Sequence, residues 1–256
     1  MSMFNKILAS VGIGSANVDT KLERDTFMPG DEVSGVVEIK GGSVEQCIDE
    51  IFLSVTTSYV KESNDKKYNE TATIERIRIN ESFTIGVNES KTIPFSFILP
   101  LDTPLTYGKT KVVISTNLDI KNALDPKDDD YINVRPTPLI HTAFIALTDL
   151  GFKLRSSECE QAPRNFQRRM PFIQEFEFVP VSGPYRGKLD ELEFTFYQPN
   201  VNEAEVLLEV DRRARGLASM FAEALDMDET KVRVTLTRQD LAGMTETLRQ
   251  IISRYS

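Results

Sequence analysis

The chain is poor in the residues on which most enzyme and metal sites depend. Its 256 residues include one histidine, two cysteines and no tryptophan. A catalytic triad, a metal-ligand pair or a proton relay would therefore have to be built around His141 alone. The sequence also lacks the H-E-x-x-H and G-x-S-x-G signatures of zinc proteases and serine hydrolases. We therefore predict a protein that is not an enzyme and needs no cofactor.

The two cysteines, Cys47 and Cys159, lie far apart and form no C-x-x-C pair, so a structural zinc ion has almost no ligands to draw on. Isolated thiols indicate buried free cysteines in a reducing compartment. The chain has no run of eighteen apolar residues, and the apolar run near its N-terminus is too short for a secretory signal. We expect a cytoplasmic protein.

An excess of acidic residues gives the chain a net charge of -9. Nucleic acid phosphates are bound by clustered lysines and arginines, so this balance predicts no nucleic-acid partner. Phe4, Ile7 and Leu8 could touch a membrane, but the single nearby lysine gives little attraction to anionic lipid. Contact of these residues with protein is therefore the favoured interpretation.

Short runs of β-branched and aromatic residues bounded by Pro, Gly and Asn predict many antiparallel strands. The clearest strand covers residues 93–99, where Phe95 and Phe97 belong to an alternating apolar face and Pro94 indicates a sheet edge. Further strands are expected at residues 32–40, 51–60, 73–79, 111–120, 139–147, 172–179, 189–197 and 203–211.

A domain junction is expected near Arg135, where an acidic turn at residues 125–131 is followed by a proline-rich segment. Strands without intervening helices on both sides of this junction predict two β-sandwiches rather than a parallel α/β sheet. The predicted domains are residues 1–134 with a leading helix, residues 135–213, and a C-terminal extension over residues 214–256.

Helical periodicity occurs at the two ends of the chain. Apolar residues recur at helical spacing from Phe4 to Val11, and residues 215–225 are rich in helix-favouring Ala, Leu and Met. A strand at residues 231–236 and an amphipathic terminal helix complete a helix-strand-helix extension. The apolar stripe of the last helix consists of Leu241, Met244, Leu248, Ile251, Ile252 and Tyr255.

This terminal stripe has two possible partners. It could pack onto the chain's own C-terminal domain, or it could be buried against a second copy in a homodimer. We favour the intramolecular packing. Thr237 and Asp240 occupy the positions of a capping box at the start of the helix.

Two charged clusters are candidate ligand sites. Arg164, Arg168 and Arg169 surround an aromatic residue and could bind a phosphate, an acidic peptide or a lipid headgroup, or could simply keep a loop soluble. The acidic turn from Asp125 to Asp130 could gather a cation. It lacks the alternate ligands, central glycine and distal glutamate of an EF-hand loop, so a solvated turn is favoured.

Several segments resemble the arrestin superfamily: FMPGDEVSGVV at residues 27–37, IPFSFILP at 93–100, and LDI with ALDPKDDDYI at 118–132. Taken in order and together with the C-terminal tail, they resemble the bacterial sporulation-control protein family. This resemblance implies two tandem arrestin-like, immunoglobulin-like β-sandwiches, no catalytic site and a regulatory role in sporulation or the cell cycle.

The favoured function is a non-enzymatic adaptor or scaffold that acts by binding other proteins. Such partners, whose identity the sequence leaves open, could add a strand to a sheet edge or place a helix in a groove. The alternative is a sandwich that binds a small ligand, an anion or a lipid headgroup, because a fold does not determine a function. The absence of tryptophan disfavours a carbohydrate ligand.

Overall fold

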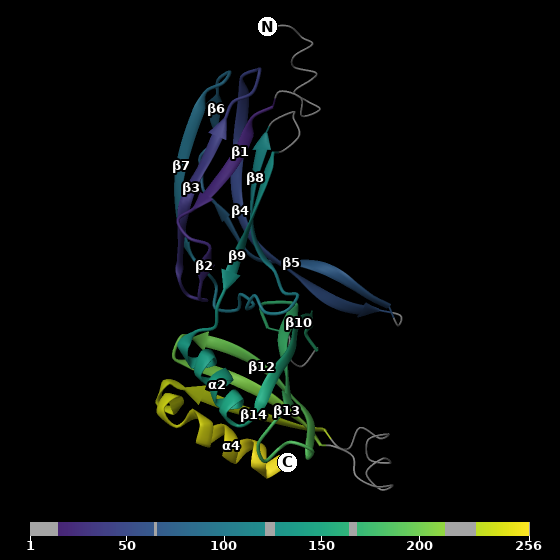
Figure 1. Ribbon diagram of the computed structural model, residues 1–256. Helices are drawn as coiled ribbons and strands as arrows, with labels where there is room; N and C mark the ends of the chain where they lie inside the picture. The colour runs from purple at the N-terminus through teal and green to yellow at the C-terminus, as the bar shows by residue number, and fades with distance from the viewer. Residues whose placement is uncertain (1–14, 64–65, 121–125, 164–167, 213–228, 256) are drawn as a thin grey trace. The chain divides into compact units, whose positions relative to one another are not determined.

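The computed structural model describes residues 15–63, 66–120, 126–163, 168–212 and 229–255 (Figure 1). Strands dominate these residues, as the sequence predicts. The N-terminal helix and the helix expected at residues 215–225 lie outside the described residues. Within the described ranges, no helix is both long and apolar enough to cross a membrane.

The chain folds into two compact units, which are not consecutive stretches of sequence. The first unit takes in Met1–Ser58, Thr71–Thr103 and Lys111–Val134, and the second takes in Tyr59–Glu70, Pro104–Thr110 and Arg135–Ser256. The linear division of the chain into three domains therefore stays a prediction.

Two groups of strands make up the first unit. The strands β1 (Asn17–Leu22), β3 (Glu32–Lys40) and β7 (Ser90–Ile98) form a three-stranded antiparallel sheet with β3 in the centre. The second group is centred on β4 (Gln46–Ser63) and continues through β8 (Val112–Ile120) and β9 (Lys127–Val134) to β2 (Thr26–Phe27). The strands β5 (Lys66–Arg78) and β6 (Phe83–Ile85) also pair with β4, although the end of β4 from Tyr59 and the start of β5 up to Glu70 belong to the second unit.

Alternate residues of these strands are buried, which is the pattern that period-two sequences predict. On β3, Val33 and Val37 are inaccessible to solvent, and on β4 the same holds for Leu53. The face predicted for residues 93–99 is confirmed, because Phe95 is buried whereas Ile98 on the other side is 61% exposed. Strand β7 is also an edge strand, as its proline indicated.

The second unit contains the antiparallel part of a larger mixed sheet, with its strands in chain order (Figure 1), and β10 also pairs in parallel with β4 through Glu160 and Val60. Its five strands are β10 (Phe152–Gln161), β11 (Phe172–Pro180), β12 (Leu189–Asn200), β13 (Glu203–Arg212) and β14 (Glu229–Thr237). Helix α2 (Pro138–Asp149) precedes the sheet. The short helix η2 (Arg238–Ala242) and helix α4 (Met244–Tyr255) follow it, and α4 packs on α2.

The strand predicted at residues 139–147 is wrong, because these residues form helix α2. Pro138 stands in the first helical turn, where a missing N–H costs nothing, and Leu139, Ala143 and Leu147 share one buried face at four-residue spacing. His141 consequently lies on a helix and not on a strand. The second unit therefore has one sheet and two α-helices among its described residues, and two tandem sandwiches are not shown.

Aromatic rings fill the core between α2 and this sheet. The ring of Phe144 lies 5.0 Å from that of Phe176 and 5.5 Å from those of Phe178 and Phe194. These tilted and edge-on arrangements are the ones that aromatic quadrupoles favour. Because Phe144 projects from the middle of α2, this cluster holds the helix on the sheet.

Gln174 attaches the segment Pro104–Thr110 to the same sheet. Its Oε1 accepts the N–H of Leu105 at 2.7 Å, and its Nε2 donates to the carbonyl of Leu105 at 2.7 Å. The side-chain amide thus makes the pair of hydrogen bonds that the backbone of a neighbouring strand would otherwise make. Both Leu105 and Gln174 are buried from water.

We predict that Gln174→Leu, which keeps the side-chain volume, lowers the free energy of unfolding of the second unit by about 2–4 kcal/mol. The reason is that it leaves the buried N–H of Leu105 unpaired and removes a hydrogen bond to the Leu105 carbonyl, which still accepts the N–H of Tyr107. Urea denaturation followed by circular dichroism measures the change. Gln250→Leu is the control, because among the described residues the exposed Gln250 amide bonds only to exposed Glu246. Equal stability of the two variants would contradict the role given to Gln174.

Candidate functional site

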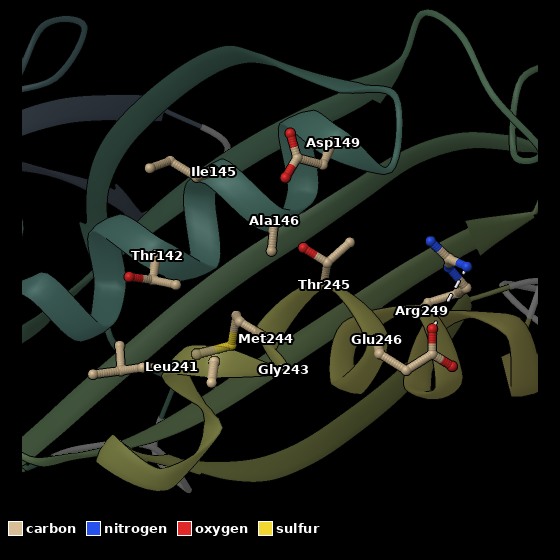
Figure 2. Close-up of a pocket in the computed structure, with 11 residues that line it drawn as sticks. Thr142, Ile145, Ala146, Asp149, Leu241, Gly243, Met244, Thr245, Glu246 and Arg249 are labelled. Atoms are coloured by element: carbon tan, nitrogen blue, oxygen red, sulfur yellow. Dashed lines mark ion pairs between the residues drawn. The ribbon is translucent and has the colours of Figure 1, made fainter.

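A groove of about 450 Å³ lies between helix α2 and the η2–α4 segment of the second unit (Figure 2). We call it the α2–α4 groove. One wall is formed by α2, with Ile145, Ala146 and Asp149, and the other by η2 and α4, with Leu241 and Met244 among its residues. The volume is within the range of roughly 300–1,000 Å³ that binding sites occupy.

The terminal helix is placed by the apolar stripe that the sequence predicts. Met244, Leu248 and Ile252 follow one another at four-residue spacing and are buried. The capping box is confirmed, because the Asp240 carboxylate accepts both the N–H and the hydroxyl of Thr237. The favoured intramolecular packing therefore accounts for half of the predicted stripe.

The other three residues of the stripe, Leu241, Ile251 and Tyr255, are only partly buried. They retain surface that a second protein could contact, and so does Ile145, which is 47% exposed on the opposite wall. Homodimerisation through the terminal helix stays a prediction. Sequence reasoning missed Ile145 as a surface residue because it placed this segment on a strand.

Tyr185 fixes the far end of α4, a role that no sequence pattern indicated. The side chain is 2% exposed, its ring lies tilted at 5.3 Å from that of Phe152, and its hydroxyl lies 2.8 Å from Ser253 Oγ. The hydroxyl also donates to the carbonyl of Arg249. Because Tyr185 comes from the loop between β11 and β12, this contact ties α4 to the sheet.

The charges around the α2–α4 groove are unevenly paired. Arg249 Nη1 lies 3.5 Å from Glu246 Oε2, so these two exposed side chains neutralise each other. Asp149, the last residue of α2, makes no ion pair or side-chain hydrogen bond with the described residues. A carboxylate at this place adds to the negative end of the helix dipole.

The predicted arginine cluster is only partly described, since Arg164 lies outside the described residues. Arg168 pairs with Glu205 at 2.5 Å, and its guanidinium lies 4.3 Å from the ring centroid of Tyr197. Arg169 is exposed. An anion would therefore have to compete with Glu205 for Arg168.

The acidic turn predicted at residues 125–130 is wrong for its second half, because Asp128 and Asp129 lie within β9. Asp128 Oδ2 accepts the backbone N–H of Thr20 at 2.7 Å, and the Asp129 carboxylate accepts the hydroxyl of Ser115. Cross-strand hydrogen bonds explain why these acidic residues extend a strand despite their low β propensity.

Asp130 is the least compensated carboxylate of this strand. Its Oδ2 is buried without a hydrogen-bond partner among the described residues. Burial, and then the nearby charges of Asp128, Asp19 and Asp129, raise the pKa of Asp130 to about 6. Asp125 lies outside the described residues, and the described residues contain no cluster of acidic, histidine or cysteine side chains that could hold a metal ion.

The two thiols differ in their surroundings. Cys159 is a buried free cysteine, as predicted, and burial raises its pKa to about 12. The prediction of burial is wrong for Cys47, which is only half-buried and lies 3.4 Å from an Asp49 carboxylate oxygen. His141 is exposed on α2.

Comparison with known proteins gives consistent matches over most of the chain. The model of the Spo0M family, described as SpoOM protein, matches residues 4–214. The sporulation-control protein spo0M of Bacillus subtilis strain 168 is 46% identical over 259 residues, which span 100% of both chains. The crystal structure of Spo0M from Bacillus subtilis has a TM-score of 0.85 and 45% identity, and the match covers 95% of this chain and 100% of that one.

We predict that Tyr185→Phe loosens α4 without unfolding the sheet, because it removes only the hydroxyl that binds Ser253 and the Arg249 carbonyl. The free energy needed to open α4 locally should fall by about 0.5–1.5 kcal/mol. Hydrogen exchange of the α4 amides measures it, with exchange in β12 as the internal reference. The control Tyr255→Phe removes a hydroxyl from a less buried ring. Unchanged α4 exchange in Tyr185→Phe would show that the hydroxyl does not hold the helix.

We predict a pH-dependent gain in stability for Asp130→Asn. The folded pKa of about 6 exceeds the ordinary value of 3.8, so the native state favours the protonated carboxyl. The stability that the protein gains from this preference is fully present below about pH 4 and is lost as the pH rises through 6. The variant should therefore be more stable at neutral pH, by on the order of 1–2 kcal/mol after allowance for solvent screening.

Melting temperatures of wild type and Asp130→Asn between acidic and neutral pH test this expectation. The advantage of the variant should shrink as the pH falls through 6. Asp119→Asn serves as the control, because it removes an exposed carboxylate from the neighbouring strand β8. A constant difference at all pH values would contradict the assignment.

Proposed function

This chain belongs to the Spo0M family of sporulation-control proteins, and on that premise we propose that it is a cytoplasmic regulatory adaptor that acts by binding other proteins. The proposal involves no reaction chemistry. Occupancy of a surface by a partner is sufficient for such a role.

The observation that supports an adaptor most directly is the α2–α4 groove. Ile145 exposes 47% of its surface beside a groove whose other wall carries the half-buried Leu241. An apolar groove with a polar rim is the surface into which partner helices place their apolar side chains. We propose that partners bind here.

The contacts that hold α2 and α4 in place favour binding to the groove without rearrangement. Phe144 anchors α2 in the aromatic core, and the buried stripe with Tyr185 anchors α4. Walls that are fixed before binding reduce the entropy lost on association. A rigid groove therefore suits a protein that acts through occupancy.

The alternative, a module for a small ligand, an anion or a lipid headgroup, would use the arginine cluster. The ion pair between Arg168 and Glu205 counts against it, because a phosphate would have to replace that pair. We therefore keep the adaptor as the proposed function.

We further propose that the first unit is an arrestin-like sandwich. Its two groups of strands come close where the hydroxyls of Thr20 on β1 and Thr116 on β8 lie 2.6 Å apart in the buried interior. The segments that resemble arrestins from Phe27 onward overlap with strands β3 and β7 of this unit.

We predict that Ile145→Ser impairs sporulation control, because it removes an exposed apolar contact while serine has nearly the same helix propensity as isoleucine. An anchor residue of this kind contributes roughly 1–3 kcal/mol to binding. The test is the sporulation frequency of a Bacillus subtilis strain that lacks its own spo0M and carries this chain.

Val201→Ser is the matched control, since Val201 is 52% exposed in the turn between β12 and β13 of the same unit. Melting temperatures of both variants should stay at the wild-type value. Wild-type sporulation with Ile145→Ser, at normal protein levels, would refute the groove as the functional surface. Truncation after Thr237 is a poorer test, because it would uncover the apolar surface that α4 buries.

A further inference from the structure

Apolar side chains line the floor and part of both walls of the α2–α4 groove. The floor between them is apolar, with Ala146 from α2 and Met244 from the start of α4 (Figure 2). Ile145 and Leu241 extend this apolar surface along the two walls. Side chains that enter the groove would therefore be aliphatic or aromatic.

The groove is acidic at the place where helix α2 ends. Asp149 has no compensating cation among the described residues, and the last turn of α2 contains no basic residue that would balance the helix dipole. The lining residues Glu246 and Arg249 cancel each other, which leaves the groove with one negative charge in excess. A lysine or arginine of a partner would relieve this imbalance.

The apolar and acidic features have a fixed spacing. Ile145 and Asp149 are four residues apart on α2, so they lie on the same face about 6 Å apart along the helix axis. An α-helix that carries an apolar residue and a basic residue one turn apart matches both positions. The groove volume of about 450 Å³ is enough for a few side chains and not for a whole helix.

We propose that the α2–α4 groove binds a basic amphipathic helix of a partner protein. The helix lies along the groove, packs apolar side chains on Ile145 and Leu241, and pairs a lysine or arginine with Asp149. The proposal rests on the proposed function, whose binding surface it uses, and adds the chemical class of the partner.

The experiment uses the full chain and two synthetic amphipathic helices of about 16 residues. Both peptides carry leucines on one face. At positions one helical turn from the leucines, the first peptide has lysines and the second has glutamates. Fluorescence anisotropy of labelled peptide gives the affinities at low and physiological salt. The wild-type protein should bind the lysine peptide at least tenfold more tightly than the glutamate peptide.

Three variants locate the binding. Ile145→Ser should weaken binding of the lysine peptide about tenfold, and Asp149→Asn should weaken it roughly two- to fivefold and reduce its salt dependence. Asp119→Asn removes an exposed acidic residue that does not line the groove, and it should bind as wild type does.

Other results would overturn the proposal. Unchanged affinity in Ile145→Ser would place the lysine peptide on another acidic surface, and unchanged affinity in Asp149→Asn would remove the reason for a basic partner. Failure of both peptides to bind, together with a dimer that Ile145→Ser abolishes in light scattering, would make a second copy the occupant.

The failures of the two proposals are distinguishable. If Ile145→Ser impairs sporulation while both peptides bind equally, the groove is functional and only the basic partner is wrong. If Ile145→Ser leaves sporulation intact, the groove is refuted as the functional surface whatever the peptides do.

Discussion

The second unit depends on the burial of one face of α2 against its five-stranded sheet. The ring of Phe144 lies within 5.5 Å of three phenylalanine rings on β11 and β12. Each buried aromatic side chain removes a large apolar area from water, and the tilted rings add specific contacts. With α2 fixed in this way, α4 has an apolar surface on which to pack, and the groove between them follows from the two helix positions.

Strand prediction succeeded in segments where the period-two alternation of apolar and polar residues was the main pattern. Residues 93–99 and 203–211 largely alternate, and strands β7 and β13 contain all of these residues except Leu99. Helix α2 was missed because isoleucine and phenylalanine are common in strands, so composition outweighed spacing. The four-residue spacing of Leu139, Ala143 and Leu147 was nevertheless present, together with a proline at the start that suits a helix better than a strand interior.

The same error concealed half of the candidate site. The stripe from Leu241 to Tyr255 could be recognised because an amphipathic helix repeats its pattern over several turns. The opposite wall could not, since Ile145 and Asp149 share a face only if α2 is a helix. Tyr185 gave no signal at all, because a loop residue that bonds to a helix 64 positions later has no periodicity to reveal it.

The division of charge and apolar surface at the groove also fits the composition of the chain. A net charge of -9 attracts basic partners over a distance of about a Debye length and repels acidic ones, whatever the local contacts are. Such attraction acts mainly on the rate of encounter, whereas residence time depends on desolvated apolar contacts. Asp149 would therefore contribute mainly to how fast a partner arrives, and Ile145 with Leu241 to how long it stays. A surface of the proposed kind can exchange partners rapidly, because no single buried ion pair has to be broken when one leaves.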